Sequence, residues 1–126
     1  MSNRPEHNLQ CSIVQWASLH KGRYPELESL YAIKNEGLRS LRLGKDFVES
    51  GMKRGMPDLC LPVPRGGYGA LFIELKSGKG KVSEYQRVVL NTLMRCGNLC
   101  LVAKTYERVT QVIVDYLKGK YERSNT

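Results

Sequence analysis

The chain of 126 residues has no long hydrophobic segment. Because a membrane-spanning helix needs about 18 or more consecutive apolar residues, no span is expected. The first six residues contain no apolar signal region, so we expect a cytoplasmic protein, located in the host cytoplasm if a phage encodes it. Internal repeats and a dividing linker are also lacking, and the length fits one domain over residues 1–126 with a core of about residues 4–118.

Acidic residues are scarce, with 12 Asp and Glu against 20 Lys and Arg, so the formal net charge is +8. This imbalance favours a polyanionic partner, nucleic acid first. Cys96 and Cys100 flank a turn and have no histidine near them, so a zinc site is not expected, and buried free thiols are preferred for the four cysteines. The glycine-rich P-loop pattern is absent, which argues against a nucleotide cofactor.

Two apolar stretches joined by a Gly- and Pro-rich turn are the most informative part of the sequence. Residues 56–61 and 70–76 predict neighbouring strands, with the turn between them. Glu74 and Lys76 are two apart in the second strand, so their side chains project from the same face. Asp58 opens the first strand and lies near Glu74 at one end of the sheet if the strands pair.

Paired carboxylates at the edge of an apolar sheet repel each other and are costly to desolvate. Mg²⁺ or Mn²⁺ relieves both problems, and an adjacent lysine could hold or deprotonate an attacking water. This chemistry suits hydrolysis of a phosphodiester. A solvated ion pair on a surface hairpin would explain Glu74 and Lys76 alone, but the preceding Pro57-Asp58, the hairpin spacing and the apolar run before Glu74 favour the catalytic interpretation.

The remaining pattern predicts an α/β fold, in which a mixed sheet is flanked by helices. Ser83 and Gln86 form a capping box that begins one of the helices. The wholly apolar strand 99–103 is expected to be covered on both faces, and the polar tail 120–126 is expected to fray. Besides the two strands above, the predicted elements are helices over residues 3–21, 39–50, 83–96 and 107–118, and strands over residues 30–34 and 99–103.

Basic residues flank the proposed site in the sequence. In the order of the chain they would lie beside the metal and contact phosphates, although any helix can carry such charges as a solvated face. The candidates for DNA binding are Arg39, Arg42, Lys45, Lys53 and Arg54 before Asp58, and Lys79 and Lys81 in the Gly-rich loop after Lys76.

Three segments together resemble the PD-(D/E)xK nuclease superfamily, and more closely its VRR-Nuc branch of virus-type replication-repair nucleases. These segments are residues 51–59, 72–76 and 83–86, and the resemblance extends over about residues 6–117. It implies a restriction-endonuclease-like core and an endonuclease that depends on Mg²⁺ or Mn²⁺.

The resemblance also implies roles for individual residues. Asp58, Glu74, the Leu75 carbonyl and Glu6 on the first helix would hold the metal. Lys76 would position or activate the water and stabilise charge, and Gln86 would lie near this lysine as well as cap its helix. Glu6 has a second explanation, because a carboxylate at a helix N-terminus is stabilised by the helix dipole.

The predicted substrate follows from the absence of an appended DNA-reading domain. Stand-alone members of this size resemble Holliday-junction resolvases, which act as dimers on branched DNA in phage or repair metabolism. A flap or nicking endonuclease is the alternative among enzymes. A non-catalytic DNA-binding module or a basic assembly partner is the alternative outside them, although clustered acids would repel phosphates.

Overall fold

The computed structural model describes residues 4–33, 49–51 and 53–124. The helix predicted over residues 39–50, with its basic residues Arg39, Arg42 and Lys45, therefore lies almost entirely outside the described residues. The described elements are α1 (Pro5–His20), η1 (Pro25–Ser29, a 3₁₀ helix), β1 (Tyr31–Ala32), β2 (Leu59–Leu61), β3 (Leu71–Leu75), α3 (Glu84–Arg95), β4 (Leu99–Ala103) and α4 (Tyr106–Leu117).

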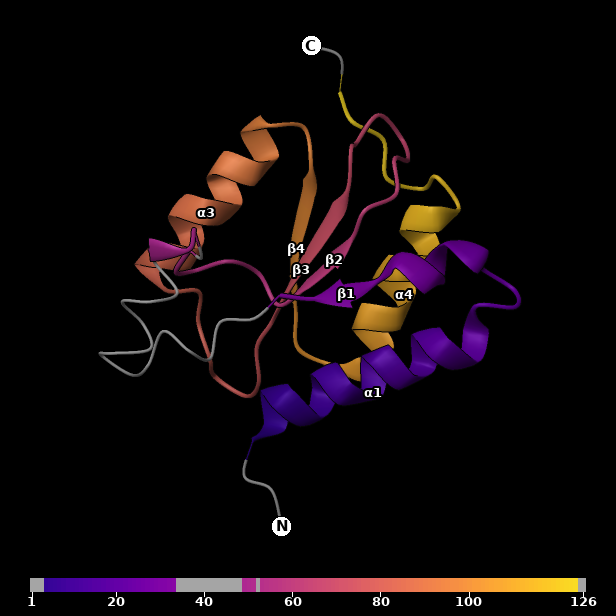
Figure 1. Cartoon of the computed structure of the whole chain (residues 1–126), viewed down its shortest axis with the longest axis horizontal. Helices are drawn as coiled ribbons and strands as arrows, with labels where there is room; N and C mark the ends of the chain where they lie inside the picture. The colour runs from indigo at the N-terminus through magenta and orange to yellow at the C-terminus, as the bar shows by residue number, and fades with distance from the viewer. Residues whose placement is uncertain (1–3, 34–48, 52, 125–126) are drawn as a thin grey trace.

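The described strands form one mixed sheet in the order β1-β2-β3-β4. β2 and β3 pair antiparallel with Cys60 opposite Phe72, as expected from the turn between them. β3 and β4 pair parallel, which requires the crossover that α3 supplies. In Figure 1 the strands lie between α3 on one side and α1 with α4 on the other. The predicted α/β fold with a mixed sheet flanked by helices is confirmed.

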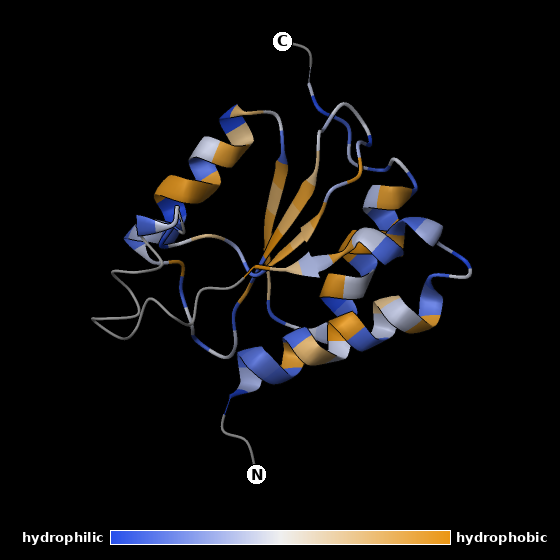
Figure 2. Ribbon diagram, in the orientation of Figure 1, coloured by the Kyte–Doolittle hydropathy of each residue, from blue (hydrophilic) through white to orange (hydrophobic). Residues whose placement is uncertain are grey.

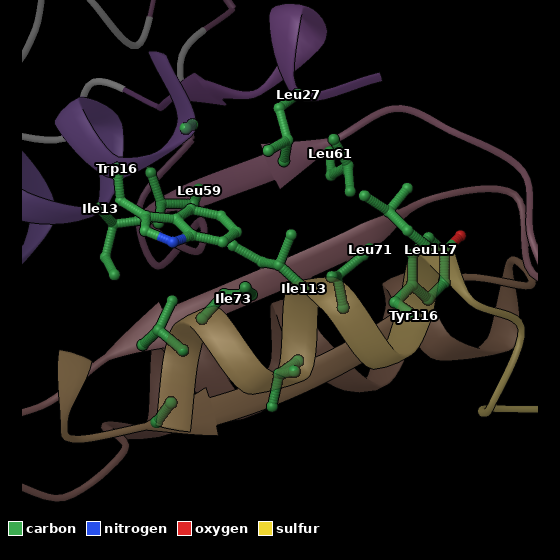
Figure 3. Close-up of a cluster of buried hydrophobic side chains, with 14 of the residues drawn as sticks. Ile13, Trp16, Leu27, Leu59, Leu61, Leu71, Ile73, Ile113, Tyr116 and Leu117 are labelled. Atoms are coloured by element: carbon green, nitrogen blue, oxygen red, sulfur yellow. The ribbon is translucent and has the colours of Figure 1, made fainter. Parts of the chain in front are cut away.

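The main core lies between the sheet and the pair α1 and α4. Figure 3 shows Ile13 and Trp16 of α1 beside Leu59 of β2, with Ile113 of α4 over the sheet. The apolar positions predicted for α4 are all buried: Val109, Val112, Ile113, Tyr116 and Leu117. Tyr116 also donates its hydroxyl hydrogen to the Val63 carbonyl at 2.6 Å, so the polar end of this buried ring is satisfied.

The α3 side of the sheet is less completely buried than the sequence predicts. The expectation that β4 is covered on both faces is wrong, since Val102 is 43 % exposed. β4 pairs with β3 alone in the described sheet, and α3 covers it only in part. In α3, Met94 is also 43 % exposed, whereas Leu90 is buried. Figure 2 shows this helix as a mixture of hydrophilic and hydrophobic residues beside the mostly hydrophobic strands β2, β3 and β4.

The C-terminal tail is held more firmly than the sequence predicts. Tyr121 packs against the core, and the Arg123 N–H donates to the Gly66 carbonyl at 2.7 Å. A Cβ on Gly66 would lie 1.9 Å from the Tyr121 carbonyl oxygen, so the turn and the tail are in direct backbone contact. The prediction of fraying is therefore wrong at these residues, because a polar tail can still dock through its backbone and one aromatic ring.

Smaller differences concern the loop before β1 and the cysteines. Residues predicted as a loop form η1, whose Leu27 is buried in the core. Cys11 and Cys96 are exposed, contrary to the expectation of buried thiols, and only Cys60 is fully buried among the four free cysteines. Within the described part of the chain, no helix has the length and apolarity needed to cross a membrane.

Candidate active site

The hairpin of β2 and β3 determines the position of Asp58. The Asp58 N–H donates to the Ile73 carbonyl at 3.1 Å, which extends the ladder one residue beyond β2. Its side-chain Oδ2 accepts the Leu75 N–H at 2.7 Å. The carboxylate therefore accepts the β3 N–H that a backbone carbonyl of a longer β2 strand would otherwise accept. This explains why Asp58 reaches the end of the neighbouring strand, where Glu74 lies.

Glu74 lies within β3 and is only 2 % exposed. Its neighbours Ile73 and Leu75 belong to the hydrophobic core, and strand alternation directs Glu74 to the opposite face. The carboxylate Oε2 is 3.2 Å from the ammonium nitrogen of Lys76, which confirms that these two side chains leave the strand together. The other oxygen, Oε1, is buried and has no hydrogen-bond partner.

Gln86 joins the helix α3 to this ion pair. Its Oε1 accepts hydrogen bonds from the Lys76 ammonium and from the Ser83 N–H, both at 2.8 Å. Its Nε2 donates to Glu74 Oε2 at 3.0 Å, while its N–H donates to Ser83 Oγ at 3.2 Å. The capping box predicted from the sequence is present, and the same amide also contacts both charged groups.

The electrostatics of the two carboxyl groups are unusual. Burial, reinforced by the neighbouring charge of Asp58, raises the pKa of Glu74 to about 8, even though Lys76 acts in the opposite direction. Burial also raises the pKa of Asp58, although the Leu75 N–H and Lys76 favour its ionised form. Full ionisation of both groups is therefore costly in the protein alone. A bound cation would remove this cost.

The residues present fit a divalent cation. Glu74 Oε1 is a buried oxygen without a partner, and Asp58 adds a second hard oxygen donor at the same strand end. A residue in a strand directs its N–H and C=O to the same side, so the Leu75 carbonyl is on the side of Asp58. These three residues could hold the ion.

Glu6 lies at the edge of this arrangement. It lines the same cleft, and its charge contributes to the raised pKa of Asp58. A Cβ on Gly80 would lie 3.6 Å from Glu6 Oε1, so the first turn of α1 is next to the loop that follows Lys76. Among the described residues, however, no three His, Cys, Asp or Glu side chains are close enough to hold one ion together. A metal-binding role for Glu6 stays a prediction.

The cleft around these groups has a volume of about 340 Å³. Besides the predicted residues it includes Tyr85, which the sequence analysis did not assign a role. In the sequence, the sign of a special role for Tyr85 is that an aromatic residue stands among polar residues at the start of a helix. The lining residues are Glu6, Arg54, Gly55, Met56, Asp58, Glu74, Lys76, Ser83, Tyr85 and Gln86.

The predicted DNA-binding residues fall into different places. Arg54 lines the cleft, whereas Lys53, Lys79 and Lys81 are exposed without lining it. The loop after Lys76 is held by a hydrogen bond from the Lys104 ammonium to the Gly78 carbonyl at 3.0 Å. Arg39, Arg42 and Lys45 lie outside the described residues. Contact with DNA stays a prediction for all of them.

The chain was compared with known protein families and structures. The family model of the VRR-NUC domain matches residues 1–106. A solved structure described as a VRR_NUC domain protein is similar, with a TM-score of 0.75 and 28% identity over 90% of this chain and 88% of that chain. No curated protein matches significantly. The hairpin with its acidic and basic residues, the fold and these similarities agree, and the chain belongs to the VRR-NUC domain family, a family of nuclease-type domains.

Proposed function

We propose that this protein is a Mg²⁺- or Mn²⁺-dependent endonuclease that hydrolyses phosphodiester bonds in branched DNA, with an activity like that of a Holliday-junction resolvase. The observation that carries the proposal is the buried pair of Glu74 and Lys76, held by Gln86 next to Asp58, with one carboxylate oxygen left without a partner. A protein that only binds DNA does not need two desolvated carboxyl groups where the DNA backbone would bind.

The roles of the side chains follow from their contacts. Asp58, Glu74 and the Leu75 carbonyl would hold the cation, with Glu6 as a further candidate. When bound, the ion supplies positive charge that stabilises the phosphate transition state. Lys76, whose ammonium is fixed by Gln86 and Glu74, orients the attacking water and neutralises charge on the phosphate. Gln86 is a positioning residue for both charged groups.

The first experiment offers four-way junctions, flaps, nicked duplex and linear duplex to the protein with Mg²⁺ or Mn²⁺, and maps the cuts. Cleavage is expected with junctions, to disappear in EDTA and to return with Mn²⁺. Glu74→Ala and Lys76→Ala should abolish cleavage and leave junction binding measurable. Unchanged cleavage by either variant contradicts the site assignment. Binding without cleavage under every metal condition would instead identify a DNA-binding module.

We further propose that the active form is a homodimer, since symmetric paired cuts need two active sites. The α3 helix offers a surface that fits a second copy. Glu84, Val88, Asn91 and Arg95 are spaced along one side of this helix and all are exposed. A two-fold axis across the helix would pair Glu84 with Arg95 of the other copy, and Val88 with Asn91. The opposite charges and the 58 % exposure of Val88 support this arrangement.

Charge reversal tests the dimer. Glu84→Arg and Arg95→Glu should each weaken association, since each places like charges together, and the double variant should restore it. Sedimentation or light scattering over a range of concentrations measures the association. If the unmodified protein is monomeric at all concentrations, paired cutting by a dimer is excluded, and a flap nuclease explains the site better than a junction resolvase.

A further inference from the structure

Arg54 and Tyr85 form a flat, positively charged surface in the cleft, here termed the Arg54–Tyr85 platform. The guanidinium carbon of Arg54 lies 5.0 Å from the centroid of the Tyr85 ring, within the range of a cation–π interaction. Both residues line the same cleft as Asp58 and Glu74. Tyr85 is 60 % exposed and is not part of the hydrophobic core. The ring therefore has a large free surface at the proposed reaction site.

The platform is fixed relative to the carboxyl groups. Gly55 has a φ of +82°, and a Cβ there would lie 2.7 Å from the Tyr85 carbonyl carbon and oxygen. The backbone next to Arg54 therefore packs directly against the first turn of α3. Tyr85 directly precedes Gln86, whose side chain contacts Lys76 and Glu74. Backbone contact on one side and the capping box on the other therefore fix the backbone of Tyr85 relative to the site.

The chemistry of the platform fits a nucleobase rather than a duplex surface. An exposed aromatic ring next to a guanidinium offers stacking on its face and charge neutralisation for an adjoining phosphate. Inside a continuous duplex both faces of a base are covered by its neighbours, whereas an unpaired base can present a free face. We propose that Tyr85 stacks on an unpaired nucleobase adjacent to the cut phosphate, while Arg54 contacts a neighbouring phosphate.

This inference rests on the proposed nuclease function and narrows its substrate class. DNA in which pairing ends within a nucleotide or two of the cut is favoured over continuous duplex. Flaps and borders between single strand and duplex provide such a nucleotide, and a four-way junction provides one where a base pair at the crossover opens, so the platform would act as the part of the cleft that recognises the branch. The specificity arises from stacking and not from the base sequence, since every base has an aromatic face.

Fluorescence tests the stacking directly. The chain has a single tryptophan, and Trp16 is buried in the core, so Tyr85→Trp introduces a second indole at the cleft. In EDTA, where cutting is prevented, DNA with an unpaired stretch should quench the new emission and blunt duplex should not. Tyr106→Trp is the matched control, because Tyr106 is 40 % exposed and does not line the cleft. Equal quenching by both DNAs, or none, overturns the proposal.

Cleavage provides the second readout. Tyr85→Ala should slow cutting of branched DNA by about 10- to 100-fold, and Tyr85→Phe should retain the rate, since stacking needs only the ring. Tyr106→Ala should have no effect. If Tyr85→Ala cuts branched DNA as well as the unmodified protein does, the platform has no such role. If the unmodified protein cuts no DNA, the nuclease proposal fails, but the quenching experiment still decides whether Tyr85 stacks on unpaired bases.

Discussion

At the scale of single residues, the amide of Gln86 has more partners than its helix requires. It closes the capping box with Ser83 and bonds both Lys76 and Glu74. Ser83 participates only in the cap. Substitutions of these two residues can therefore be compared: loss of the Ser83 side chain removes the helix cap, whereas loss of the Gln86 side chain also removes the contacts that align the site.

Gln86→Ala should lower the cleavage rate by about 10- to 100-fold, as is typical for residues that orient catalytic ligands. Ser83→Ala should lower the free energy of unfolding by about 1 kcal/mol and leave the rate nearly unchanged. Cleavage assays paired with thermal melts make the comparison. Equal losses of rate in the two variants would mean that Gln86 acts only as a cap.

The raised pKa of Glu74 predicts how stability depends on pH. In the folded protein without metal this carboxyl binds its proton with a pKa of about 8, compared with 4.5 as the ordinary value. Between these values the folded state holds more protons than the unfolded state, so stability falls as pH rises, by at most about 1.4 kcal/mol per pH unit. The Tm in EDTA should therefore decrease from pH 5 to pH 8.

Glu74→Gln is the control for this dependence, since the amide cannot ionise. Its Tm should vary much less over the same pH range. A divalent cation should raise the Tm of the unmodified protein more at pH 8 than at pH 5, because the metal needs the ionised carboxylate. A pH-independent Tm of the unmodified protein in EDTA would show that Glu74 is already ionised in the folded state.

At the scale of secondary-structure elements, the contact between the segment before β2 and the start of α3 depends on glycine. Gly55 has a positive φ, and its Cα approaches the backbone of Tyr85 and Gln86 closely. Gly51 has a φ of +96°, but a Cβ there would meet nothing within 4 Å. Both glycines therefore have a positive φ, but only Gly55 lies against the backbone of another element.

Both Gly51→Ala and Gly55→Ala should lose about 1 kcal/mol of stability from strain at positive φ. Only Gly55→Ala should also displace the first turn of α3, and its cleavage rate should fall by at least about 10-fold, as after a small misplacement of catalytic groups. Melting and cleavage assays of both variants test this. Similar activity in the two would show that the helix start tolerates displacement.

The sequence predicted those elements whose cause is local. The hairpin followed from its turn residues and alternation, the start of α3 from its capping box, and α4 from its apolar spacing. The exposure of Val102 and Met94 was not predictable in this way, since it depends on which strand ends the sheet and how much of that face α3 covers. The apolar pattern of a strand does not reveal whether the strand lies in the centre or at the edge of its sheet.

The candidate site was predictable to a similar extent. Residue spacing brought Glu74 and Lys76 together, and the hairpin brought Asp58 to them. The place of Tyr85 in the cleft had no signal beyond an aromatic residue in a polar helix start, because the contact between residue 55 and α3 joins segments that are distant in the chain and leaves no periodic pattern. Long-range backbone contacts of this kind are set by the whole fold.

At the scale of the whole molecule, the C-terminal tail joins the last helix to the turn of the hairpin. Tyr121 packs on the core, and the Arg123 N–H bonds the Gly66 carbonyl. Tyr121→Ala should lower the free energy of unfolding by about 1–2 kcal/mol, since part of an aromatic ring would no longer be buried. Denaturant melts measure the change.

Glu122→Ala is the neighbouring control, because this side chain is exposed. Its stability should remain within about 0.5 kcal/mol of the unmodified protein. Cleavage by Tyr121→Ala at low temperature should be unaffected, since the tail contacts the turn at residue 66 and, as far as residue 124, does not line the cleft. A loss of activity without loss of stability would place the tail in the function of the site.

Because Gln86 Oε1 accepts from both the Ser83 N–H and the Lys76 ammonium, this side chain cannot leave the charged pair without also releasing the Ser83 N–H. The backbone N–H of Ser83, bonded to Gln86 Oε1, should therefore exchange with deuterium faster once the Gln86 side chain leaves the charged pair. Exchange at that one position then measures how often Gln86 releases Lys76 and Glu74.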